Sequence, residues 1–141
     1  MFKVIVVGAD GSPTARRAIE AAAELAAMSE GTLHIVSAYE SKNISASDLP
    51  AEFKHVNPEG EVQALLQELS FVAKNKGTEP VLHSVTGAPA EAIISTAERL
   101  NADLIVVGNK GMRGARRVLG SVPNSVAHGA NCSVAIIDTT V

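Results

Sequence analysis

The segment 108–121, "GNKGMRGARRVLGS", carries four cationic side chains and no carboxylate. The cations are Lys110, Arg113, Arg116 and Arg117, and glycine recurs among them. A solvated helix face normally alternates its cations with acids, and each glycine in a helix interior costs about 1 kcal/mol relative to alanine. The segment therefore predicts a loop that binds an anion.

The positions of the glycines indicate phosphate as that anion. Gly108 directly follows an apolar run, Gly111 and Gly114 allow the backbone to turn, and Gly120 with Ser121 begins the next helical segment. Backbone N–H groups in such a turn form a concave anion site, and a helix N-terminus adds partial positive charge. We expect a ring of inward-facing amides, the Ser121 hydroxyl and the nearby cations to hold the phosphate.

Other phosphate-binding patterns do not match this chain. The P-loop pattern GxxxxGK[ST] and the dinucleotide pattern GxGxxG are both absent. A flavodoxin-like FMN site is disfavoured because Asp10 occupies the first strand-end loop and aromatic residues make up only 3% of the chain. A phospho-receiver domain needs an aspartate after the third strand, where "HSVTGA" has none.

Composition limits the class of protein further. The 141 residues predict one domain, and a net charge of −3 argues against nucleic acid or an anionic membrane as partner. The longest apolar runs are far shorter than the ~20 residues that a membrane span needs. "MFKVIVVG" leads directly into a strand-like run, so no signal peptide is expected. A single cysteine, Cys132, fits a reducing compartment, and we expect a cytoplasmic protein.

Short β-branched runs alternate with helical segments, a pattern typical of a parallel sheet with helical crossovers. We expect an α/β fold, an open three-layer sandwich with strand order 3-2-1-4-5, as one domain over residues 1–141. Ligands bind such sheets beyond the carboxyl ends of the strands, where strand order reverses. Strands one and four, ending in "VVGADGS" and "VVGNKG", are expected to flank that crevice. The expected strands cover residues 3–7, 32–39, 79–85, 103–107 and 132–138.

The helical segments carry their own start and stop signals. The first has a mostly alanine apolar face, which permits close packing on the sheet, and residues 40–57 predict a surface loop. Helices are expected from Pro13, capped by Ser12, to before Gly31; from Pro58 to before Gly77; over 88–101; and over 121–130.

The chain resembles the universal stress proteins over essentially its whole length. Their ATP-binding members carry G-x2-G-x9-G-[ST] after a strand, and "GNKGMRGARRVLGS" supplies Gly108, Gly111, Gly120 and Ser121. The segments "VVGADGS", "VTGAPAEAI", "ADLIVVGNKG" and "GSVPNSVAHGANCSVAIID" extend the resemblance. The chain departs from the pattern at one point, because eight residues separate Gly111 from Gly120 where the family usually has nine.

The resemblance implies ATP as ligand, with Mg²⁺, and a homodimer formed through strand 132–138. It places Asp10 near the ribose or near a divalent ion bound to the phosphates. The residues implied at the nucleotide form three groups: Gly8, Ala9 and Asp10 at the adenosine; Ser37, Ala38 and Val107 at the adenine; and Gly108, Gly111, Met112, Arg113, Gly120, Ser121 and Val122 at the ribose and phosphates.

Several residues also have ordinary structural interpretations. Asp10 could cap the first helix or close an Asx-turn, and Met112 could fill a gap instead of packing on a base. The four histidines show no metal-ligand spacing. Cys132 is typical of a small buried residue.

The leading functional interpretation is a non-catalytic, homodimeric ATP-binding regulator whose nucleotide occupancy modulates an unknown protein partner. No catalytic nucleophile–base pair is recognisable in the sequence. A slow ATPase or self-phosphorylating protein, with Asp10 holding a metal and Ser121 as acceptor, is the second interpretation. A nucleotide-free dimeric interaction module is the third, and a cyclic nucleotide is a variant ligand for the first.

Overall fold

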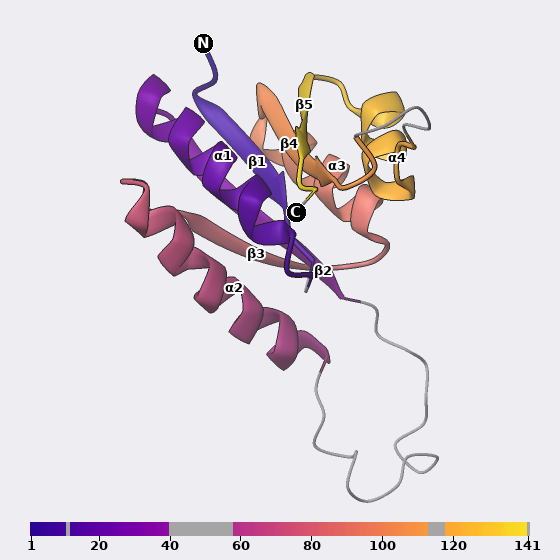
Figure 1. Cartoon of the computed structure of the whole chain (residues 1–141), viewed down its shortest axis with the longest axis horizontal. Coiled ribbons are helices and arrows are strands. Elements are labelled where there is room, and N and C mark those ends of the chain that lie inside the picture. The colour runs from indigo at the N-terminus through magenta and orange to yellow at the C-terminus, as the bar shows by residue number, and fades with distance from the viewer. Residues whose placement is uncertain (11, 40–57, 113–117, 141) are drawn as a thin grey trace, which may run out of the picture.

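The computed structural model describes residues 1–10, 12–39, 58–112 and 118–140. Its strands form a five-stranded sheet in the order β3-β2-β1-β4-β5, with every neighbouring pair parallel (Figure 1). The predicted strand order is therefore confirmed. The strands are β1 (Val4–Gly8), β2 (Thr32–Tyr39), β3 (Val81–Thr86), β4 (Leu104–Asn109) and β5 (Ser133–Asp138).

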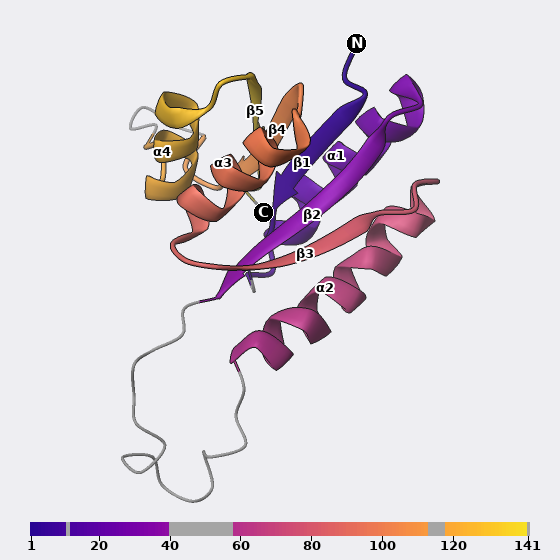
Figure 2. The same ribbon diagram turned by 180° about the vertical axis from the view of Figure 1, so that it is seen from behind.

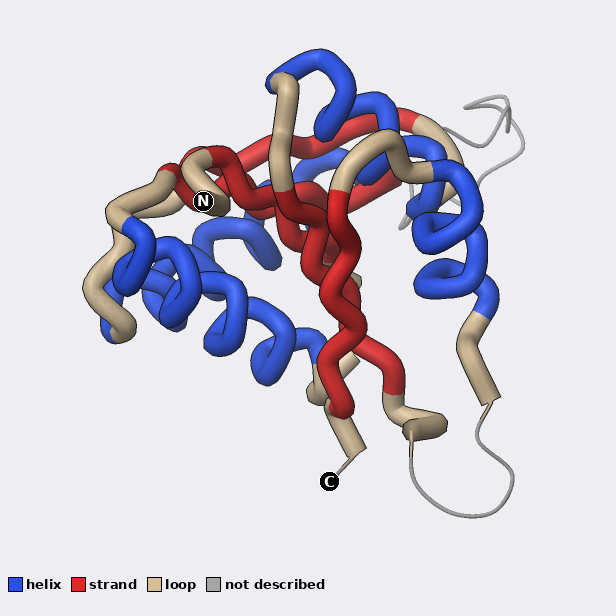
Figure 3. Tube along the Cα trace, turned by 90° about the horizontal axis from the view of Figure 1, so that it is seen from above, coloured by secondary structure: helices blue, strands red, loops and turns tan. Residues whose placement is uncertain are grey.

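Helices cover both faces of this sheet, which confirms the three-layer α/β sandwich. Helices α1 and α2 pack on one face, and α3 and α4 pack on the other (Figures 1 and 2). Figure 3 shows the strands between the two helical layers. The helices are α1 (Ala15–Ser29), α2 (Pro58–Asn75), α3 (Pro89–Leu100) and α4 (Ser121–Gly129).

The central strand β1 divides the core into two clusters because its side chains alternate between the faces. Ile5 and Val7 pack with α1 and α2, whereas Val6 packs with α3 and α4, and all three are fully buried. Helix α1 buries alanines such as Ala18 and Ala22. These small side chains let α1 lie close to the sheet, as the sequence predicted.

Helix α1 begins two residues later than expected. The Ser12 carbonyl accepts a hydrogen bond from the Ala15 amide at 3.2 Å, so residues 12–15 form a turn before the helix. The Ser12 hydroxyl pairs with Thr14 Oγ1 at 3.1 Å, and Thr14 is the N-cap residue. The Ser-Pro signature therefore marks a turn here, since Pro favours the second position of a turn as well as the first turn of a helix.

The carboxyl ends of β1 and β4 lie side by side, as predicted. The two strands pair in parallel from Ile5 with Leu104 to Val7 with Val106. At their amino ends, the Asp103 carboxylate accepts hydrogen bonds from the amides of Lys3 at 2.8 Å and Val4 at 3.1 Å. These hydrogen bonds at the amino ends of the two strands thus help to fix the register that brings the two loops at their carboxyl ends together.

The predicted loop 40–57 lies outside the described residues, as do Arg113, Gly114, Arg116 and Arg117 of the cationic segment. Among the residues described, no helix is both long enough and apolar enough to cross a bilayer.

Candidate functional site

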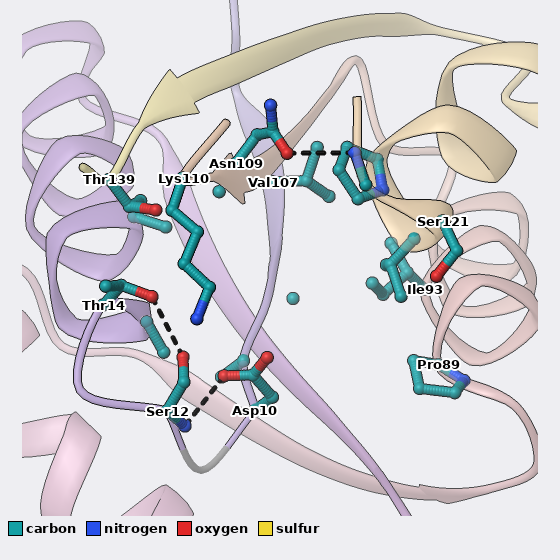
Figure 4. Close-up of a pocket in the computed structure, with 18 residues that line it drawn as sticks. Asp10, Ser12, Thr14, Pro89, Ile93, Val107, Asn109, Lys110, Ser121 and Thr139 are labelled. Atoms are coloured by element: carbon teal, nitrogen blue, oxygen red, sulfur yellow. Dashed lines mark hydrogen bonds between the residues drawn. The ribbon is translucent and has the colours of Figure 1, made fainter. Parts of the chain in front are cut away.

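A cavity of about 380 Å³ lies beyond the carboxyl ends of β1 and β4 (Figure 4). Its walls come from the loop between β1 and α1, the first residues of α3, the end of β4, the first turn of α4, and Thr139. Thr139 follows β5 directly. The cavity occupies the position where strand order reverses, which is where open parallel sheets bind ligands.

The loop after β1 supplies the acidic side of the cavity. Asp10 Oδ1 accepts a hydrogen bond from the Ser12 amide at 2.9 Å, which is the geometry of an Asx-turn. The Asp10 side chain nevertheless lies at the cavity and is exposed (Figure 4). Asp10 therefore combines its structural interpretation with a position that could meet a ligand.

The residue after β4, Lys110, supplies the basic side. Its side chain extends into the cavity toward Asp10 (Figure 4). Its backbone carbonyl accepts a hydrogen bond from Thr140 Oγ1 at 2.7 Å. Among the described lining residues, Lys110 is the one cation and Asp10 the one carboxylate, so a phosphate has a charged partner on this side.

The first turn of α4 opens onto the same cavity. Gly120 is the N-cap residue, with φ −60° and ψ 164°, and no side chain caps the helix. The amides of Ser121 and Val122 belong to the first turn, where an α-helix provides no internal acceptor. These amides carry the partial positive charge of the helix terminus, and the Ser121 hydroxyl adds a donor at the same place (Figure 4).

The remaining wall is apolar. Val107 on β4 is 2% exposed and Ile93 on α3 is 4% exposed, and both line the cavity. A Cβ on Gly8 would lie 2.3 Å from Ile93 Cδ1. Glycine at this strand end therefore lets α3 pack closely over it. Val107 and Ile93 thus give the cavity an apolar wall that could contact a nucleotide base.

The cavity brings together part of the predicted set. Ser37, Ala38, Gly111 and Met112 do not line it, and Arg113 lies outside the described residues. The Ser37 hydroxyl instead donates to the Ala9 carbonyl at 2.9 Å and supports the β1 loop from behind. The predicted residues that line the cavity are Gly8, Ala9, Asp10, Val107, Gly108, Gly120, Ser121 and Val122.

The chain after β4 differs from the expected ring of inward-facing amides at two positions. The Val118 amide donates to the Gly111 carbonyl at 3.1 Å, and the Gly120 amide donates to Asn109 Oδ1 at 3.0 Å. The Gly120 amide therefore donates to the carboxamide of Asn109 and not to a ligand. Ser121 and Val122, at the start of α4, line the cavity, and no side chain caps this end of the helix.

Sequence reasoning missed several lining residues. Asn109 gave a weak signal, because it follows Gly108 at the end of a buried strand. Thr139 gave none, since its place depends on β5 returning beside β4; its Cγ2 would lie 2.8 Å from a Cβ on Gly108. The lining residues outside the predicted set include Ser12, Thr14, Pro89, Ile93, Asn109 and Thr139.

Comparison with known proteins agrees with the fold and with the family resemblance of the sequence. The model of the Universal stress protein family matches residues 1–138. A universal stress protein of Mycobacterium tuberculosis is 37% identical over 144 positions, covering 99% of this chain and 98% of that protein. Universal stress protein A homolog 1 of Coxiella burnetii is 34% identical over 140 positions, covering 94% of each.

Solved structures give the same result. A universal stress protein in complex with cAMP is 35% identical, with a TM-score of 0.78 and coverage of 99% of both chains. The universal stress protein from Archaeoglobus fulgidus in complex with dAMP shares the fold, with a TM-score of 0.74 at 24% identity, over 96% of this chain and 98% of that one. The chain therefore belongs to the universal stress protein family.

Proposed function

We propose that residues 1–141 form one domain that binds an adenine nucleotide in the cavity between β1 and β4. The observation that carries this proposal is the first turn of α4, which opens onto the cavity without a side-chain cap. Helix N-termini favour phosphate through their free amides and their dipole. Lys110 stands on the same cavity with a compensating charge, and Val107 and Ile93 offer an apolar surface to the base.

ATP is the ligand that we place first, as the resemblance to the ATP-binding members implies. Asp10 would then lie where it can hold a nucleotide-bound Mg²⁺, an ion that proteins often bind through one or two carboxylates plus substrate phosphates. Cyclic AMP is the second candidate, because a universal stress protein 35% identical to this chain was solved with it. Either ligand would direct a phosphate at the Ser121 and Val122 amides.

We propose that this binding regulates protein interactions in the cytoplasm. The described lining residues offer hydroxyls, one carboxylate and one ammonium group, a set suited to holding a ligand. Strand β5 is an edge of the sheet, and an edge strand is a ready template for pairing with another chain. A homodimer through Ser133–Asp138 would place two cavities in one particle, and their occupancy would alter how that particle binds a protein partner.

Calorimetric titration tests the proposal, using ATP with and without Mg²⁺, cAMP, adenosine and GTP. We expect saturable binding of ATP or cAMP at one site per chain, and weaker binding of GTP. Lys110→Gln should weaken binding of the nucleotide. The matched control Lys76→Gln should not, because Lys76 pairs with Glu24 at 3.0 Å and does not line the cavity.

Absence of saturable binding by any adenine nucleotide below about 1 mM, which corresponds to roughly −4 kcal/mol, would reject the proposal. Sedimentation velocity tests the dimer separately. We expect the mass of two chains, and a single-chain mass at every concentration would refute the dimer.

A further inference from the structure

Asn109 is the last residue of β4, and it is a buried polar residue that lines the cavity. Only 6% of its surface is exposed. Its backbone pairs with Asp138 of β5, and its carbonyl accepts a hydrogen bond from the Thr139 amide at 3.2 Å. The sheet therefore fixes the backbone of Asn109 and leaves its carboxamide directed at the start of α4 (Figure 4).

That carboxamide bonds to the returning chain in two directions. Asn109 Nδ2 donates to the Val118 carbonyl at 3.0 Å, and Asn109 Oδ1 accepts from the Gly120 amide at 3.0 Å. A third bond, from the Val118 amide to the Gly111 carbonyl at 3.1 Å, lies beside them. We call residues 109–111 and 118–120, joined by these three hydrogen bonds, the loop neck.

The residue type suits this task. A neutral carboxamide offers a donor and an acceptor on one short planar group. An aspartate could accept from Gly120 but could not donate to Val118 when ionised. The side chain of alanine could do neither, so the neck would keep only the bond between Val118 and Gly111.

The neck sets where the helix amides point. Gly120 is the residue immediately before the first-turn amides of Ser121 and Val122. The space around Gly120 is narrow, because an added Cβ would lie 3.3 Å from Asn109 Oδ1 and 3.5 Å from Pro123 Cδ. Binding of the Gly120 amide by Asn109 thus holds the chain path into α4 and leaves the next amides for a ligand.

We propose that Asn109 is a positioning residue for the nucleotide phosphate, acting through the loop neck on the amides of Ser121 and Val122. This inference rests on the proposed function, since it assigns a determinant of affinity within the same cavity. It goes beyond that function by predicting a selective effect. Asn109 should matter for ligands that carry a phosphate and matter little for adenosine.

The experiment compares wild type with Asn109→Ala, Asn109→Asp and the matched control Asn131→Ala. Asn131 also donates a side-chain hydrogen bond, to Glu98 Oε1 at 2.9 Å, but does not line this cavity. For each variant we would measure dissociation constants for ATP, cAMP and adenosine by calorimetry, and the melting temperature. Hydrogen exchange of the Gly120 amide, followed by NMR on the ligand-free protein, reports the neck itself.

Asn109→Ala should raise the dissociation constant of the nucleotide about tenfold, because two neutral hydrogen bonds are lost. The dissociation constant of adenosine should change less than about threefold. Asn109→Asp should weaken the nucleotide at least as much, because it places a negative charge near the phosphate, yet should retain slow exchange at Gly120. Asn131→Ala should match wild type. A purely structural role would change both ligands equally, so the ratio of the two affinities is the deciding quantity.

Equal weakening of nucleotide and adenosine, or no weakening of either, would overturn the inference while leaving nucleotide binding intact. Unchanged Gly120 exchange in Asn109→Ala would overturn it as well. If wild type binds no nucleotide, the proposed function fails and the inference fails with it, whereas the exchange data still report whether the neck exists. If Asn109→Ala does not fold, the neutral variant Asn109→Ser carries the same comparison, because a single short hydroxyl cannot replace both the bond to Val118 and the bond to Gly120 and adds no charge near the phosphate.

Discussion

Replacing Gly111 with alanine would test the loop neck by steric pressure. A Cβ on Gly111 would lie 2.4 Å from the Val118 carbonyl oxygen, whereas real Cβ contacts essentially never fall under 3.0 Å. The neighbour is backbone and cannot rotate away as a side chain can. The two segments of the neck, 109–111 and 118–120, must therefore separate by at least about half an ångström.

That separation would disrupt two hydrogen bonds. The Val118 amide bonds to the Gly111 carbonyl at 3.1 Å, and the Val118 carbonyl accepts from Asn109 Nδ2 at 3.0 Å. Each contributes about 0.5–1.5 kcal/mol net, and alanine returns about 0.4–1 kcal/mol at most by reducing the entropy of the unfolded chain. We expect a loss of about 1–2 kcal/mol in the free energy of unfolding, or roughly 3–8 °C in melting temperature.

The assay is thermal unfolding by circular dichroism, together with calorimetric titration of the nucleotide. Gly129→Ala is the matched control, since its added Cβ would lie 2.8 Å from Ile94 Cδ1, the mobile end of a side chain. Gly129→Ala should leave the melting temperature unchanged or raise it. A Gly111→Ala protein as stable as wild type, with the same nucleotide affinity, would refute the reasoning about the neck.

Three further predictions concern charge and pH. Burial lowers the pKa of His34 and of His83 from the usual 6.5, and their rings share an Nδ1–Nε2 contact of 2.9 Å. The folded state therefore binds protons at these two histidines less readily than the unfolded chain does. Their contribution to the free energy of unfolding should be complete above about pH 6.5 and should be lost as the pH falls below it. Urea unfolding at pH 7.5 and 5.5 would check this, and equal free energies of unfolding at the two pH values would contradict it. Lys110→Gln should weaken ATP several-fold and flatten its salt dependence while adenosine is unaffected, and calorimetry at two salt concentrations would detect an unchanged slope if Lys110 does not meet phosphate. Asp103→Ala removes the carboxylate that accepts two amides at the start of β1 and should cost about 1–3 kcal/mol in urea unfolding; a midpoint equal to that of wild type would show that this tie contributes nothing.

The alternation of strands and helices, and the two strand ends that flank the cavity, could be predicted because local patterns indicate them. Continuous apolar runs identified the buried parallel strands, and the glycines after residues 3–7 and 103–107 identified the strand ends that meet. The start of α1 could not be placed correctly, because Ser12 and Pro13 fit a turn as well as a helix start. Ser12 and Pro13 correctly marked a boundary before α1, but these residues form a turn and not the start of the helix.

The detailed site depends on contacts between distant parts of the chain, which one sequence does not display. Ser37 is a polar residue at a strand end, yet its hydroxyl supports the Ala9 carbonyl instead of lining the cavity. The two side-chain hydrogen bonds of Asn109 depend on Val118 and Gly120, which the fold brings back beside the end of β4. Thr139 reaches the cavity because β5 pairs with β4. Tertiary pairing of this kind decides which polar atoms remain available to a ligand.

The most direct measurement is a crystal structure of the protein grown with saturating ATP or cAMP. We predict a phosphate within hydrogen-bonding distance of the Ser121 and Val122 amides, with the base against Val107 and Ile93 and the Gly120 amide still bonded to Asn109. A nucleotide bound elsewhere on the protein, or this cavity empty at saturating ligand, would contradict the account.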